Sequence, residues 1–277
     1  MAHLERILVY PIKSLDSVWV EQAEFVTSGG LEWDRRFAIV DDAGGYVNGK
    51  RDATIHRIRV EYDLEPGTIT ISAAAPDGSG RGRSIDEQTF HLEVDRRAIE
   101  ELLTDFFGYP VQLVRDDAGG FPDDTDAAGP TVISTATLDA VAGWFDDVDA
   151  SEMCRRLRPN LVVGDVEAFW EDHLFDVPGR VVPFDVGDVR IHGVNPCQRC
   201  VVPSRDPDTG ESIEGFRETF VEHRKATLPE WANEEWFDHY FRVMVNTRVP
   251  ESSWGERIEV GETVTVSEPI SSTSNGP

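Results

Sequence analysis

Short β-rich segments separated by turn signals run along most of this chain, and they limit its fold more than any other feature. The turns include DDAGG (41–45) and EPG (65–67). The segments are rich in β-branched and aromatic residues, and examples are HLERILVY (3–10), RFAIVDD (36–42), YVNGK (46–50), TITISA (68–73) and FRVMVNTRV (241–249). Helical spacing is confined to a few stretches, namely 95–108, 134–145, 213–225 and 230–240. The sequence therefore predicts a mainly β fold with inserted helices.

An acidic segment rich in glycine and proline, DDAGGFPDDTDAAGP (116–130), has no periodicity. A second loop is expected at AAAPDGSGRG (73–82). The pattern of many strands on either side of the acidic segment favours two β-barrels. We expect an N-terminal β-barrel-like domain over 1–118, a linker or mobile loop over 119–130, a second β-barrel domain over 131–268 and a flexible tail over 269–277.

The net charge of the chain is −26, from 52 acidic and 26 basic residues. Lysine occurs only at Lys13, Lys50 and Lys225. An acid-rich, lysine-poor surface is typical of proteins from halophilic organisms, where salt screens the self-repulsion. This charge argues against nucleic acid as a partner, because phosphate binding needs a basic face. We expect a cytoplasmic protein without a membrane partner, since neither an apolar run of 18 residues nor a signal peptide is evident.

Two of the three cysteines lie in NPCQRC (195–200). A C-x-x-C pair supplies half of a structural zinc site, which Cys154 or His192 would have to complete. A redox dithiol is a second interpretation, although the prolines that follow disfavour the helix that such motifs open. A third is one thiolate bound to a soft metal that an organic cofactor already holds. Both cysteines could also be small buried residues. Arg199, between them, favours the thiolate of whichever one it faces.

The longer stretch NPCQRCVVPSRDPDTGE resembles the signature of the MOSC domain, the module named for its presence in molybdenum-cofactor sulfurases. Three further blocks in the same order resemble this family and its N-terminal β-barrel domain: VYPIKSL (9–15), LEWDRRFAIVD (31–41), and LRPNLVV (157–163) followed by EDH (171–173). The matches run from about residue 3 to about residue 267. The chain is similar to the subgroup of the mitochondrial amidoxime-reducing component and the bacterial reductases of N-hydroxylated bases.

This resemblance implies a site residue by residue. Cys200, the second cysteine of the motif, takes the family's role of molybdenum ligand and catalytic residue, and Arg199 helps to position the molybdopterin. The other implied cofactor contacts are Lys13 and Ser14 of YPIKS, Arg36 of DRRF, Ser134 and Thr135 of STATL, and Arg158 and Asn160 of RPN.

The resemblance also implies an activity. A molybdenum-cofactor oxidoreductase would reduce N-hydroxylated small molecules, such as amidoximes and hydroxylamines, with molybdopterin held between the two domains; pyridoxal phosphate is not expected. Electrons would come from a separate donor protein of ferredoxin or flavoprotein type, since no iron–sulfur motif follows residue 267. The alternatives are a non-catalytic carrier of the cofactor or of persulfide sulfur on Cys200, and a zinc-stabilised binding module.

Overall fold

The fold is mainly β with a few helices, as the sequence predicts. The structure, a computed structural model, describes residues 1–75 and 82–272. Its strands are β1 (His3–Val9), β2 (Val18–Val20), β3 (Gln22–Glu24), β4 (Phe37–Asp41), β5 (Ile58–Asp63), β6 (Thr68–Ala73), β7 (Ile85–His91), β8 (Val111–Arg115), β9 (Val132–Ser134), β10 (Leu161–Gly164), β11 (Arg180–Val186), β12 (Val189–Gln198), β13 (Arg242–Arg248), β14 (Arg257–Glu259), β15 (Val264–Val266) and β16 (Ile270–Ser271).

The helical elements are short. The α-helices are α1 (Arg96–Phe107), α2 (Thr135–Ala142), α3 (Ala150–Leu157) and α4 (Phe216–Ala226), and the 3₁₀ turns are η1 (Ala53–Arg57), η2 (Trp170–Leu174), η3 (Val202–Ser204), η4 (Glu234–Trp236) and η5 (Glu251–Ser253). Within residues 1–75 and 82–272, none of these helices has the length and apolar composition to cross a bilayer.

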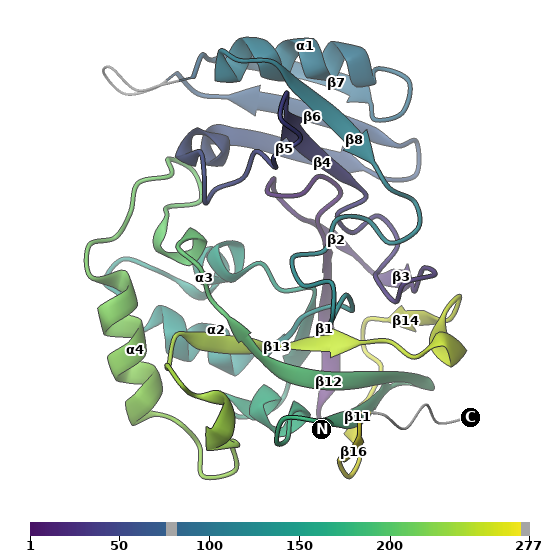
Figure 1. The fold of residues 1–277 in the computed structure, drawn as a ribbon, viewed down its shortest axis with the longest axis vertical. Helices are drawn as coiled ribbons and strands as arrows, with labels where there is room; N and C mark the ends of the chain where they lie inside the picture. The colour runs from purple at the N-terminus through teal and green to yellow at the C-terminus, as the bar shows by residue number, and fades with distance from the viewer. Residues whose placement is uncertain (76–81, 273–277) are drawn as a thin grey trace.

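A nine-stranded sheet forms the lower part of the molecule (Figure 1). Its strand order is β15-β11-β12-β13-β9-β10-β1-β2, with β16 paired to β11. The first two strands of the chain thus form one edge of a sheet whose other strands come from residues 132–271. β1 is antiparallel to β10, with His3 opposite Gly164 and Ile7 opposite Leu161. The N-terminal strand therefore belongs in space to the second half of the sequence.

The upper part contains the three-stranded sheet β5-β6-β7 and the β4-β8 pair, beside α1 (Figure 1). The buried face of α1 contributes Ile99, Leu103, Phe106 and Phe107 to a core that these strands share. The helix stops at Gly108, whose φ of 77° costs glycine no strain. This part therefore has a hydrophobic core of its own.

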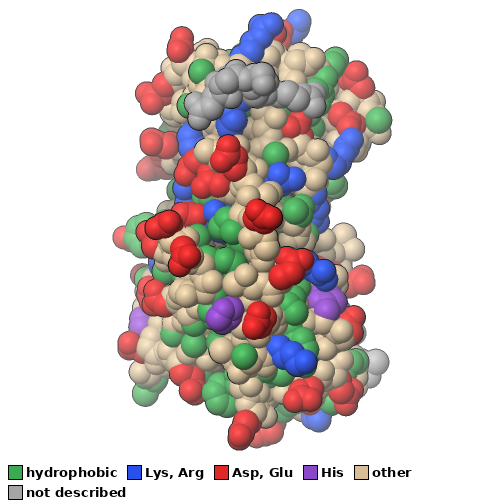
Figure 2. All heavy atoms as spheres, turned by 90° about the vertical axis from the view of Figure 1, so that its left-hand side faces the viewer, with side chains coloured by type: hydrophobic (Ala, Val, Ile, Leu, Met, Phe, Trp, Pro, Cys, Tyr) green, Lys and Arg blue, Asp and Glu red, His purple; other side chains and the backbone are tan. Residues whose placement is uncertain are grey.

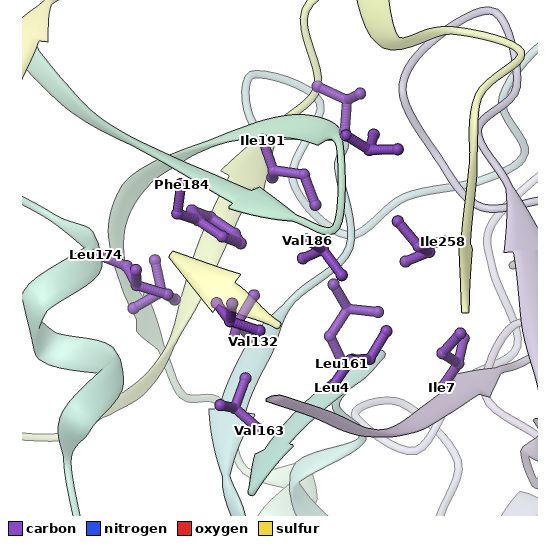
Figure 3. Close-up of a cluster of buried hydrophobic side chains, with 14 of the residues drawn as sticks. Leu4, Ile7, Val132, Leu161, Val163, Leu174, Phe184, Val186, Ile191 and Ile258 are labelled. Atoms are coloured by element: carbon purple, nitrogen blue, oxygen red, sulfur yellow. The ribbon is translucent and has the colours of Figure 1, made fainter. Parts of the chain in front are cut away.

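Both faces of the nine-stranded sheet are buried. Along β1 and just after it, Ile7 and Val9 join one core cluster, whereas Leu8 and Tyr10 join another that α2, α3 and α4 cover. This alternation follows from the two-residue repeat of a strand. Figure 3 shows the first cluster, in which side chains from β1, β9, β10, β11 and β12 converge. The sheet is therefore packed between two hydrophobic clusters, one on each face.

The structure differs from the predicted elements in several places. Residues 46–50 are not a strand and contribute only a bridge between Val40 and Tyr46. The stretch 230–240 contains one 3₁₀ turn, η4, in place of a helix, and α3 was not expected. Within the expected tail, Ile270–Ser271 pairs with β11, and residues 273–277 lie outside the described residues, as do 76–81 of the expected loop at 73–82.

Candidate functional site

A cavity of about 1110 Å³ lies where loops from both halves of the sequence meet. Ser72 of β6, three residues of β13 and two residues of the DRRF motif, Asp34 and Arg35, add to its wall. The main contributing stretches fall within residues 10–17, 48–61, 122–131, 155–160 and 195–208. Four of these five stretches overlap segments that carry the sequence resemblance or the segment expected to be a linker. The segment at 119–130 thus supplies part of the wall.

The charge of the cavity wall is opposite to that of the chain. Acidic residues outnumber basic ones by 52 to 26 in the whole chain, and Figure 2 shows acidic side chains spread over one face of the molecule. Among the described lining residues, six are acidic and ten are basic: Lys13, Arg35, Lys50, Arg59, Arg155, Arg156, Arg158, Arg199, Arg205 and Arg242. A concave surface with this excess of cations attracts an anionic ligand.

The cysteine loop leaves the end of β12 at Gln198. Cys197 and Cys200 both line the cavity as free thiols. Arg199 faces Cys197: one of its nitrogens lies 3.1 Å from the Cys197 sulfur, and another donates to the carbonyl of Leu157 at 2.8 Å. The Cys200 sulfur accepts a long hydrogen bond, 3.5 Å, from the backbone N–H of Val202. Cys200 is thus a half-buried thiol in the cavity wall, and the hydrogen bond that its sulfur accepts comes from the backbone of its own loop.

The other interpretations of the cysteine pair find little support. Within the described part of the chain, no group of three or more His, Cys, Asp or Glu side chains is placed to hold a metal ion, so a protein-only zinc site lacks ligands. Cys154 lies in the core beside α2 and α4, where burial raises the pKa of its thiol. After Cys200 there is only the three-residue turn η3 with Pro203, not the helix typical of a redox dithiol.

Arg158 ends α3 in the left-handed conformation, with φ of 59°. Its guanidinium lies over the Tyr10 ring, 4.1 Å from the centroid. Within residues 1–75 and 82–272, no carboxylate lies at ion-pair distance from it, and burial lowers the pKa of the group. A half-buried, unpaired arginine is unusual in a chain with so many carboxylates, and it indicates a ligand position.

Lys13 and Asn160 line the same cavity but have partners. The Lys13 ammonium donates to the carbonyl of Phe121 at 2.9 Å and pairs with Asp123 at 2.6 Å. Asn160 is 1% exposed; its amide nitrogen donates to the carbonyl of Leu8, and its oxygen accepts from Arg35 at 3.3 Å. Asn160 therefore orients a cavity cation. Ser14, with φ of 76°, also lines the cavity.

Three residues of the predicted cofactor set are not among the described lining residues of the cavity. Arg36 lies outside it, paired with Asp117 at 2.6 Å and Glu93 at 3.3 Å and stacked over Trp33. Ser134 is fully buried as the N-cap of α2, where its hydroxyl accepts from the N–H of Thr137. The hydroxyl of Thr135 donates to Glu5 at 2.7 Å.

Arg35 enters the cavity in place of Arg36. It has φ of 50°, so the chain turns at this residue and the two adjacent arginines face different surroundings. Its guanidinium pairs with Asp34 and approaches Asp123 at 3.9 Å. Sequence reasoning also missed His56 and Arg205. Arg205 lies within the NPCQRCVVPSRDPDTGE motif, which was a signal for it, whereas His56 lies in none of the motifs.

Comparison with protein families agrees with this arrangement. Residues 1–110 match the model of the MOSC N-terminal beta barrel domain, and residues 126–265 match that of the MOSC domain. Curated relatives called mitochondrial amidoxime-reducing component 1 are 26% identical in Danio rerio (74% of this chain, 69% of the relative), 25% in Homo sapiens (79% and 73%) and 23% in Xenopus laevis (87% and 77%). The chain therefore belongs to the MOSC domain family and carries the N-terminal barrel domain of that family as well.

Proposed function

We propose that this protein is a molybdenum-cofactor-dependent reductase of N-hydroxylated compounds such as amidoximes. Membership of the MOSC family and similarity to amidoxime-reducing components support a reductase associated with the molybdenum cofactor. The observation that carries the proposal is the large cation-rich cavity lined by the free cysteine Cys200, in a chain whose net charge is −26.

The side chains of the cavity fit molybdopterin, which combines an anionic phosphate, a polar pterin and a soft metal centre. Cys200 would be the metal ligand, because a thiolate is the preferred partner of a soft metal. Arg158 would contact an anionic group, since it has no carboxylate partner in the described structure. The remaining proposed contacts are Lys13, Ser14, Asn160 and Arg199, with Arg35 in the position first assigned to Arg36.

The cofactor supplies the two-electron oxygen chemistry of the reaction. An amidoxime plus two electrons and two protons gives an amidine and water, so each turnover needs an electron donor. We propose a separate redox protein in this role, of ferredoxin or flavoprotein type. The part of the chain itself is to hold the cofactor by Cys200 and the cavity cations and to position the substrate beside it.

Reduction of benzamidoxime tests the proposal. Protein loaded with cofactor in a host that makes it should convert benzamidoxime to benzamidine with an artificial electron donor. Cys200→Ser should lose more than about 100-fold in activity, because a metal ligand is removed. The matched control is Cys154→Ser, which changes a cysteine in the core. Loaded protein that holds molybdenum and reduces no N-hydroxylated compound would refute the reductase and favour the carrier alternative.

A further inference from the structure

One wall of the cavity is built where the loop after Cys200 packs against η1 and β5. Gly210 has φ of 77°, and a Cβ atom there would lie 2.4 Å from the carbonyl oxygen of Ala53. Arg59 of β5 donates to the carbonyl of Pro207 at 2.7 Å and pairs with Asp208 at 3.0 Å. These contacts fix the 205–210 segment relative to the upper part of the molecule.

Arg205 lies in this wall without a counter-charge. One of its terminal nitrogens donates to the carbonyl of Gly210 at 3.2 Å, and its buried Nε has no hydrogen-bond partner. No carboxylate of the described chain lies at ion-pair distance from it. Its neighbours Arg59 and Arg155 differ, because both pair with Asp208. The charge of Arg205 is therefore available to a ligand.

His56 lies in this wall among three arginines. Burial first, and then Arg158, Arg205 and Arg59, lower the pKa of its imidazole to about 4, so the ring is neutral at pH 7. One carboxylate, Asp206, also acts on the ring. The arginines therefore outnumber the carboxylates at this wall, and they would attract an anion placed here.

Arg205 and the proposed cofactor contacts line the same cavity but have different partners. Lys13 and Arg35 share Asp123, whereas Arg205 donates to the carbonyl of Gly210. Arg158 lies between them, because its charge acts on both Asp123 and His56. The cavity volume of about 1110 Å³ also exceeds the range of roughly 300–1,000 Å³ that is usual for one small ligand. There is room for a second molecule beside a cofactor.

We propose that Arg205 binds a carboxylate group of the substrate, so that the preferred substrates are N-hydroxylated compounds with a negatively charged substituent. This inference rests on the proposed reductase function, and it adds the substrate class and a specificity-determining residue. An arginine–carboxylate contact inside a cavity is strong because the guanidinium presents parallel donors to both oxygens.

Two substrates that differ by one carboxylate test the inference: benzamidoxime and 4-carboxybenzamidoxime. The loaded wild type should have about tenfold higher kcat/KM for the carboxylate compound, as one charge-assisted contact predicts. Arg205→Gln should remove this preference and leave kcat/KM for benzamidoxime within about twofold. Arg205→Lys should restore part of it. Arg97→Gln, which removes an exposed charge on α1, is the control and should change neither value.

Direct binding separates the failure of this inference from the failure of the proposed function. In calorimetry, 4-carboxybenzamidoxime should bind wild-type protein about tenfold more tightly than benzamidoxime, and Arg205→Gln should abolish the difference at unchanged molybdenum content. Equal affinities in the wild type, or an equal loss for both compounds in Arg205→Gln, would overturn the role of Arg205. Loaded protein that binds the two compounds as expected but reduces neither would refute the reductase alone.

Discussion

Two charged regions of this protein differ in whether their arginine has a carboxylate partner. Arg224, in α4, is 0% exposed; it pairs with the buried Asp172 at 2.5 Å and lies over the Phe169 ring. Arg158, at the end of α3, is half-buried and has an aromatic ring beneath it, but no carboxylate of the described chain pairs with it. We call the surroundings of Arg224 and Asp172 the closed region, because the arginine there is paired within the protein, and we expect it to support the fold. We call the cavity around Arg158 the open region, because an arginine without a carboxylate partner is available to a ligand.

The closed region extends to residues that the sequence assigned to the cofactor. Glu171, next to Asp172, accepts hydrogen bonds from the hydroxyl of Thr137 at 2.9 Å and from the N–H of Ser134 at 3.3 Å. Ser134 and Thr137 in turn share a hydrogen bond. The EDH motif therefore anchors α2 and α4 to the sheet, and we expect its residues to act on stability and not on cofactor affinity.

The largest effect is expected for Arg224→Met. This change leaves the buried Asp172 without its partner, and breaking a buried pair in this way costs about 3–5 kcal/mol of unfolding free energy. Denaturant unfolding at constant high salt measures it. Molybdenum content per folded molecule should stay at the wild-type value. A stable variant that has lost its molybdenum would mean that the closed region serves the cofactor.

Glu171 provides a pH test of the same region. Burial and the adjacent Asp172 raise its pKa to about 7, above the value of 4.5 for an unperturbed glutamate. The folded state then binds more protons than the unfolded state between pH 4.5 and 7, so this group makes the unfolding free energy fall as pH rises, by up to about 3 kcal/mol. Glu171→Gln should remove that fall.

The comparison to make is the difference between wild type and Glu171→Gln across pH 4.5–8, since other groups contribute equally to both proteins. The Gln variant should gain stability relative to wild type as pH rises through 7. Parallel stability curves would contradict the raised pKa.

In the open region, Arg158→Gln should lower cofactor affinity about tenfold, the usual loss for one charge-assisted contact. The stability of the cofactor-free protein should stay the same or rise, because burial already disfavours the charge of this arginine and no partner is left behind. Cofactor content after dialysis and the melting temperature of the cofactor-free protein measure the two effects. A clear drop in that melting temperature would show that Arg158 supports the fold.

The smallest effect belongs to the adjacent pair Arg35 and Arg36. Arg36→Gln removes the cation from ion pairs whose carboxylates, Asp117 and Glu93, are exposed, and it should cost less than about 1 kcal/mol of stability, with cofactor content unchanged. Arg35→Gln should lower cofactor content, because Arg35 lines the cavity. Equal loss of cofactor in both variants would mean that Arg36 also contacts the cofactor.

The sequence predicted the β-rich fold from local patterns, and the family resemblance gave a set of site residues of which Lys13, Ser14, Arg158, Asn160, Arg199 and Cys200 line the cavity. It could not choose between Arg35 and Arg36, since the choice depends on a left-handed turn at Arg35. Nor could it place β1 beside β10, because nothing local links residues about 155 positions apart. Helix α3 did have a signal, the N-cap Asp149, which the sequence reasoning passed over.

The most direct test of the open cavity is the molybdenum and pterin content of protein from its native host, measured for wild type, Cys200→Ala and Cys197→Ala. Both cysteines line the cavity, but only Cys197 is engaged by Arg199. We predict near-stoichiometric molybdenum in the wild type and in Cys197→Ala, and its loss in Cys200→Ala. Full molybdenum content in Cys200→Ala, or none in the wild type from a host that makes the cofactor, would contradict this account.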